Sequence, residues 1–81
     1  MLFRSTLEES IREIFFQTFP AFKKSDFNWN LSQINMDEWD SFAHLNLITL
    51  VESKFNIEFS IDETVSIQSL KILLKLIEQK I

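Results

Sequence analysis

The chain has no cysteine and no glycine, and it has one proline and one histidine among 81 residues. Without cysteine it cannot form a disulfide framework or a thiolate metal site, and one histidine cannot build a histidine-based zinc site. Without glycine it cannot form the phosphate-cradling loops of P-loop or dinucleotide-binding proteins. Tight hairpins are disfavoured as well, because their two-residue turns favour glycine. The composition therefore favours helices.

The chain also lacks the uninterrupted run of roughly 18 apolar residues that a membrane span needs. Its first ten residues turn acidic before any apolar stretch of the length found in secretory signals. The missing cysteine fits a reducing compartment. We therefore expect a cytoplasmic protein with no membrane span, folded as a single domain over residues 1–81.

Negative charge is concentrated in the middle of the chain, although the overall net charge is only -4. Residues 37–63 hold seven acids and one base, so this stretch has a net charge of -6 and the remainder +2. Clustered acids disfavour nucleic-acid binding and suit a partner with a basic surface. The alternative is that they only keep the domain soluble.

The first helix is predicted to begin near Ser5 or Thr6, each of which is followed three residues later by a glutamate, as in a capping box. Pro20 should end it near Phe19. Residues 20–40 then form a long first loop, which contains two Trp and two Phe. Because a solvated linker would not carry so many aromatics, we expect this loop to pack across the helices and to include a short helical turn.

The second helix is predicted to begin at Asp40 or Ser41 and to end near Asn56, which can adopt the left-handed conformation of a helix cap. Apolar residues recur along it at helical spacing. Its expected stripe is Phe42, Leu45, Ile48, Val51 and Phe55, widened by Leu47 and Leu50.

A short helix should open with a capping box made by Ser60 and Glu63, and Ser66 is the expected cap of the last helix. The last helix carries one apolar stripe, formed by Ile67, Leu70, Leu74, Ile77 and Ile81. The expected aromatic core is Phe15, Phe19, Trp29, Trp39 and Phe55. The predicted fold class is thus all-α, a small four-helix bundle with three main helices, one short helix and a long first loop.

Ser41 stands at the start of the second helix, directly after Asp40. Both residue types are common helix caps, which is the simplest explanation for them. A helix N-terminus also offers free N–H groups and the positive end of the helix dipole, which would stabilise a phosphate. Asp40 would repel such a phosphate, so its benefit would come during attachment, by holding a metal or orienting the hydroxyl.

The stretch Asp40-Ser41-Phe42 resembles the Asp-Ser-Leu motif of the acyl carrier protein family, and with Trp39 before it and Ala-His-Leu after it, it looks like carriers that stand alone. The run from Leu47 to Phe55 is similar to the second helix of that family. The connection that follows and the Ser66-Ile67 pair also match in register.

The resemblance implies a fold of acyl-carrier type and a function. Ser41 would receive 4'-phosphopantetheine from coenzyme A through a phosphopantetheinyl transferase that uses magnesium. The arm would carry an acyl or aminoacyl thioester between an activating ligase and an acyltransferase or synthase, and the chain itself would not be an enzyme. Phe42 would be the exposed apolar contact for partners, with Asp40 and Glu52 supplying charge. We expect a monomer.

The chain departs from the family in having Phe42 for leucine and a less acidic second helix. Fatty acyl, polyketide, aminoacyl and sugar-modifying acyl groups are all open as cargo, and the Trp-Asp-Ser form favours a specialised secondary or surface-polysaccharide pathway. A cargo cavity would be lined by Leu45, Ile48, Val51 and Leu70.

Two other hypotheses compete with a carrier. The first is an unmodified helical adaptor of the same fold, which binds a partner protein through its acidic end. The second is a small hydrolase built on Ser41 and His44, which lie three residues apart on one helix. Because nothing nearby resembles an oxyanion hole or an orienting acid, we expect His44 instead to be solvated or loosely capped.

Overall fold

The computed structural model describes residues 4–81, with side chains from Thr6 onward. It contains four α-helices and a short 3-10 helix in the first loop: α1 (Arg4–Thr18), η1 (Lys24–Asp26), α2 (Ser41–Phe55), α3 (Ile61–Ser66) and α4 (Leu70–Lys80). No strand is formed within residues 4–81. The predicted all-α class, with three main helices, one short helix and a long first loop, is confirmed.

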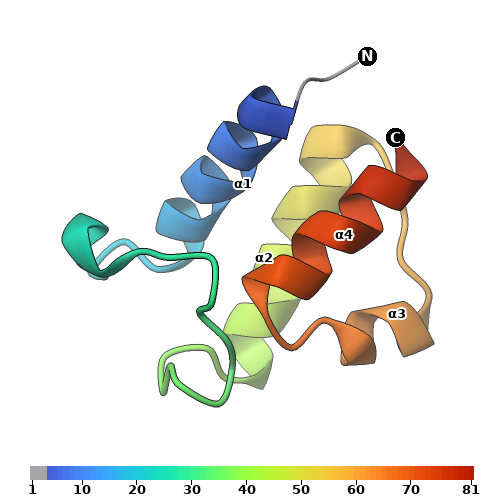
Figure 1. The fold of residues 1–81 in the computed structure, drawn as a ribbon. Coiled ribbons are helices and arrows are strands. Elements are labelled where there is room, and N and C mark those ends of the chain that lie inside the picture. The colour runs from blue at the N-terminus through green and yellow to red at the C-terminus, as the bar shows by residue number, and fades with distance from the viewer. Residues whose placement is uncertain (1–3) are drawn as a thin grey trace.

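The α1 and α2 helices pack side by side, and α4 crosses in front of α2 in the view of Figure 1. The α1 helix runs opposite to α2, whereas α4 runs in the same direction as α2, and the short α3 leads into the start of α4. None of the helices in the described range is both long and apolar enough to cross a membrane.

The first two helices end where their sequences predict. The α1 helix stops at Thr18, and the Phe19 N–H still donates to the Phe15 carbonyl before Pro20. It starts at Arg4, so Thr6 lies inside the first turn and not at a cap, while the Ser5 side chain lies outside the described residues. The α2 helix ends at Phe55, and Asn56 takes the expected left-handed conformation, with φ 55° and ψ 50°.

Aromatic rings hold α1 and the first loop together. Phe15 is fully buried, and its ring lies 4.9–5.3 Å from the rings of four other phenylalanines in α1 and the loop, namely Phe16, Phe19, Phe22 and Phe27. Phe19 in turn contacts Trp39, with ring centroids 6.2 Å apart. The expected core positions of Phe15, Phe19 and Trp39 are confirmed, and Trp29 and Phe55 pack half-buried against that core.

The first loop packs across the helices as expected. An isolated antiparallel bridge pairs Ser32 with Ser69, and the adjoining hydrogen bonds join Gln33 N to the Gln68 carbonyl (2.9 Å) and Leu70 N to the Leu31 carbonyl (3.1 Å). These bonds attach the middle of the loop to the connection between α3 and α4.

Several predicted side-chain positions are wrong. Ser66 is the last residue of α3, and Ser69 caps α4 by accepting the Ile72 N–H, because Ile67 is buried between the two helices. Ile81 follows the end of α4 and is about half exposed. On α2, Leu45 faces solvent at 60% exposure, and the buried face consists of His44, Leu47, Ile48 and Val51. Leu45 therefore cannot line an interior cavity.

The central position of Phe15 predicts that a Phe→Leu substitution lowers stability more at Phe15 than at Phe42. Phe15→Leu should lower the free energy of unfolding by about 1–2 kcal/mol, because it leaves a void and removes four ring contacts. Phe42→Leu, at a position 75% exposed, should change it by less than about 0.5 kcal/mol. Urea unfolding followed by circular dichroism measures both, and equal losses would contradict the aromatic core described here.

Candidate functional site

Asp40, and not Ser41, caps the N-terminus of α2. Asp40 has extended backbone angles, and its Oδ1 accepts the Ala43 N–H at 2.9 Å. Its carbonyl accepts the His44 N–H, which is the first bond of the helical ladder. Ser41 is therefore the first helical residue, its side chain is exposed, and its hydroxyl makes no hydrogen bond within the described part of the chain. The cap is complete without it.

His44 is buried, which contradicts the expectation of a solvated histidine. It is 8% exposed, and both ring nitrogens are engaged: Nδ1 lies 3.0 Å from the Trp39 indole Nε1, and Nε2 lies 2.8 Å from the Thr64 carbonyl. Its ring is also 6.1 Å from the Trp39 ring. Because neither nitrogen contacts Ser41, this arrangement supplies no general base to the serine. The Ser–His nucleophile that a hydrolase would need is absent from this geometry.

Large apolar side chains are exposed on α2, which begins at Ser41, and on α3. They are Phe42 and Leu45 of α2, at 75% and 60% exposure, and Ile61 and Val65 of α3, at 83% and 67%. The hydrogen bond from His44 to Thr64 brings the two helices together here, since Leu45 and Val65 are the neighbours of the bonded pair. We call these four residues the Ser41 face. Large apolar side chains that are exposed on adjoining helices are typical of a protein-interaction surface.

A groove of about 400 Å³ borders the other side of Phe42. It lies between the end of α1, the first turn of the loop and the start of α2, and its lining includes Phe19, Pro20, Phe22, Asp40, Phe42 and Ala43. The remaining lining includes Glu38, so the groove joins apolar walls to an acidic edge. Phe42 thus belongs both to the lining of this groove and to the Ser41 face.

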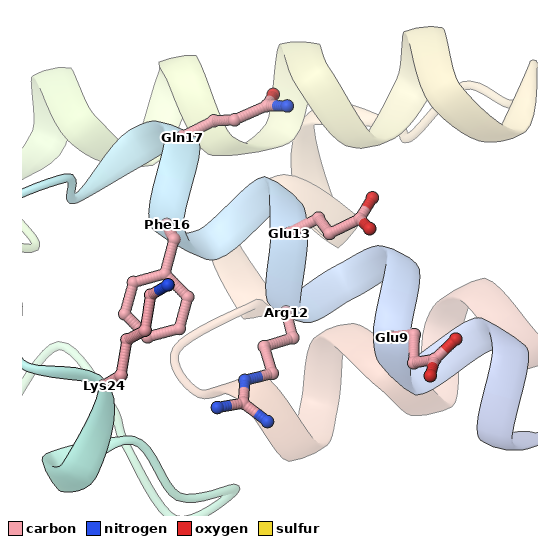
Figure 2. A pocket seen from close by; sticks show the side chains of 6 residues that line it. All are labelled: Glu9, Arg12, Glu13, Phe16, Gln17 and Lys24. Atoms are coloured by element: carbon pink, nitrogen blue, oxygen red, sulfur yellow. The ribbon is translucent and has the colours of Figure 1, made fainter.

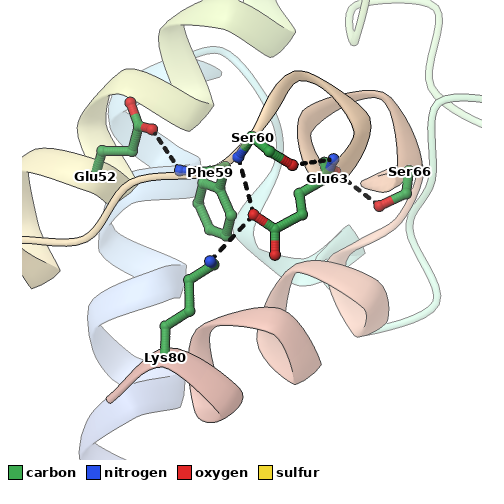
Figure 3. A network of polar contacts seen from close by, with 6 residues as sticks. All are labelled: Glu52, Phe59, Ser60, Glu63, Ser66 and Lys80. Carbon is green, nitrogen blue, oxygen red and sulfur yellow. Dashed lines mark hydrogen bonds and ion pairs between the residues drawn. The ribbon is translucent and has the colours of Figure 1, made fainter.

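Polar contacts hold the beginning of α3, as Figure 3 shows. Ser60 and Glu63 form the predicted capping box, with bonds of 2.9 and 3.1 Å. Lys80 at the end of α4 pairs with Glu63 at 3.1 Å and lies 5.5 Å above the Phe59 ring. Glu52, predicted to meet partners, is half-buried and accepts the Phe59 N–H at 2.9 Å, so it has an internal partner as well.

A second depression lies on α1, and Figure 2 shows its lining. It is formed by Glu9, Arg12, Glu13, Phe16, Gln17 and Lys24. The Arg12 guanidinium lies 5.9 Å from the Phe16 ring and 5.3 Å from the Phe27 ring, which fits a cation–π contact that covers the aromatic core. With two acids, two bases and no residue of α2, this depression selects neither anions nor cations and adds nothing to the serine site.

No group of three or more side chains within residues 4–81 is arranged to hold a metal ion by itself. A scan against protein-family models finds no match to the chain, and a search of curated proteins finds no similar sequence. The assignment of the candidate site therefore depends only on the residues of this chain. Ser41, Asp40 and Phe42 meet at the N-terminus of α2 as predicted, whereas sequence reasoning missed the roles of His44 and Trp39.

The cap predicts how two substitutions of Asp40 should differ. Asp40→Ala should lower the free energy of unfolding by about 1 kcal/mol, because the Ala43 N–H loses its acceptor. Asp40→Asn keeps an oxygen at that position and should retain most of the stability. Thermal and urea unfolding check both variants. An equal loss in the two would mean that the charge, and not the cap bond, is what matters.

The Glu63 contacts predict a dependence of stability on pH. The Ser60 N–H, and then Lys80, hold the pKa of Glu63 below its ordinary value of 4.5. The folded state therefore favours the carboxylate, and the stabilisation is present above pH 4.5 and is lost as the pH falls through the lowered pKa. The difference in unfolding free energy between wild type and Glu63→Gln should shrink in acid. When Lys80→Gln is also present, the pH-dependent part of this free-energy difference should be smaller. If the difference between wild type and Glu63→Gln does not change with pH, the prediction is wrong.

Proposed function

We propose that this chain is a carrier protein of acyl-carrier type, whose Ser41 bears 4'-phosphopantetheine. The observation that carries the proposal is that Asp40 and Ser41 have different roles at the start of α2. Asp40 completes the cap, and Ser41 stands exposed on the first helical turn with no structural partner in the described chain. A serine needed only for the fold would be engaged in it, whereas a serine that is modified must be reachable.

The backbone around Ser41 fits a phosphodiester. Of the first-turn N–H groups, Ala43 donates to Asp40, whereas those of Ser41 and Phe42 precede the helical ladder and remain available to an anion. The cap bond uses Oδ1 of the exposed Asp40, so its second oxygen can take a magnesium ion that a transferase brings. This assigns Asp40 a role in attachment in addition to the cap.

The transfer forms a bond between the Ser41 Oγ and the phosphorus that carries the pantetheine. The pyrophosphate bond of coenzyme A breaks, and adenosine 3',5'-bisphosphate leaves. The serine proton goes to a base of the transferase, because His44 is engaged with Trp39 and Thr64 and cannot accept it. Once attached, the arm supplies a terminal thiol that holds acyl or aminoacyl groups as thioesters. The chain itself contributes an exposed hydroxyl and a surface.

The Ser41 face supports docking of enzymes that load and use the arm. Exposed acids are close to its residues in the sequence, namely Asp37, Glu38 and Asp40 before Phe42, and Asp62 directly after Ile61. A partner with an apolar contact ringed by basic side chains would complement such a surface. We therefore propose a transferase, an activating ligase and an acyltransferase or synthase as partners, with Phe42 as the central apolar contact. The cargo classes named above all suit this proposal.

Labelling with coenzyme A tests the proposal directly. The purified chain is incubated with coenzyme A, magnesium and a broad-specificity phosphopantetheinyl transferase, and its intact mass is measured. We expect wild type to gain one phosphopantetheinyl group and Ser41→Ala to gain none.

Ser53→Ala is the matched control, because Ser53 is an exposed serine of the same helix and its loss should leave labelling unchanged. Circular dichroism establishes that each variant is folded. If folded wild type gains no mass with several transferases, the carrier proposal fails. The adaptor alternative would then be tested by whether binding of a partner survives Ser41→Ala.

A further inference from the structure

His44 is the only buried polar side chain among the described residues. It lies on the core-facing side of α2, together with Leu47, Ile48 and Val51. A leucine there would add apolar burial and require no hydrogen bonds. Nothing in the core explains the presence of an imidazole except its two bonds, so these bonds indicate its role.

The two bonds fix a single tautomer of His44. An indole N–H can only donate, so Nδ1 must accept from Trp39. The Thr64 carbonyl can only accept, so Nε2 must carry the proton and donate to it. The His44 ring thus links Trp39, which precedes Asp40, to Thr64 in the last turn of α3.

The α3 helix depends on such ties because none of its residues, Ile61–Ser66, is buried. Its beginning is held by the Glu63–Lys80 pair and by the bond between Phe59 and Glu52 just before it. Its last turn is held to α2 by the bond from His44 to Thr64. That bond therefore helps to set where the last turn of α3, which includes Val65, lies relative to the first turn of α2.

We propose that His44 is a positioning residue, whose Nε2–H docks α3 beside Ser41 and so completes the surface that the modifying transferase reads. The placement of α3 is independent of the proposed function, whereas the effect on modification rests on it. Loss of the Thr64 bond leaves the helix intact through its capping box and leaves Ile67 buried behind it, but it removes the bond that joins the last turn to α2. A transferase then meets a Ser41 face in which Val65 is displaced.

Two substitutions separate the two bonds. Glutamine can place its amide nitrogen near the position of Nε2, so His44→Gln keeps the donor for Thr64 and loses the acceptor for Trp39. Asparagine can place its oxygen near Nδ1, so His44→Asn keeps the acceptor and loses the donor. His44→Leu removes both. Comparison of the first two tests the proposal, because a general loss of core stability would affect both.

Modification by the transferase is the first measurement. We expect kcat/KM for His44→Asn and His44→Leu to fall about tenfold, since the Ser41 face is misplaced. His44→Gln should stay within about threefold of wild type, because it keeps the Thr64 bond. If His44→Asn is modified as fast as wild type, or His44→Gln as slowly as His44→Leu, the proposed positioning role is wrong.

Nuclear magnetic resonance of the unmodified protein is the second measurement, and it does not depend on carrier function. Nitrogen-15 spectra should show the Nε2–H tautomer of His44. Amide exchange at Thr64 and Ile67, whose N–H groups bond within and after α3, should be faster in His44→Asn by about tenfold and unchanged in His44→Gln. The Trp39 indole signal should shift in His44→Gln and in His44→Leu, but not in His44→Asn.

The two measurements distinguish the two ways of failing. Absence of any labelling in wild type, with the expected tautomer and exchange, would overturn the carrier proposal and leave the placement of α3 by His44 standing. The opposite tautomer, or equal exchange in both variants, would overturn the role of His44 even if Ser41 is labelled.

Discussion

The hydrogen bond from the Trp39 indole to His44 fixes where α2 begins. Trp39 is 2% exposed, contacts Phe19 and donates its indole proton at 3.0 Å. A buried indole needs such an acceptor, and burial of so large a ring stabilises the fold by at least about 1.5–3 kcal/mol. The end of the first loop cannot shift without exposing the Trp39 ring. Asp40 follows Trp39 directly in the chain, so its position is fixed as well. The cap and the exposed Ser41 are therefore held in place by a core contact on their N-terminal side.

A chain without glycine must make its turns by other means, and here asparagine replaces it. Asn56 is the one residue with positive φ among those described, and its short side chain tolerates that conformation. In the first loop, the Asn28 side chain accepts the Asn30 N–H and the Asn35 side chain accepts the Ser32 N–H, both at 2.8 Å. Features of this kind depend on neighbours in sequence. For that reason the end of α2 and the capping box of α3 could be predicted.

The features that sequence reasoning missed depend on contacts between distant segments. Apolar residues surround most of α2, so spacing alone could not decide that Leu45 faces solvent while His44 faces the core. The burial of His44 follows from Trp39 and Thr64, and the latter lies twenty residues away. Ser66 and Ser69 are both good caps, and only the burial of Ile67 between them selects Ser69. Local chemistry predicted the helices and the position of Ser41 at the start of α2, whereas packing between distant segments decided which side chains of α2 are buried.

The electrostatics at Ser41 show why Asp40 is compatible with modification. A negative charge at a helix N-terminus is stabilised by about 0.3–1 kcal/mol. Repulsion between two charges about 6 Å apart in water costs about 0.7 kcal/mol. The two effects nearly cancel, so a phosphodiester on Ser41 would leave the stability of the fold almost unchanged. The cap supplied by Asp40, about 1 kcal/mol, then outweighs what remains of the repulsion. An acid next to Ser41 would thus be compatible with its modification at little cost, because the same carboxylate holds the helix end that presents the serine.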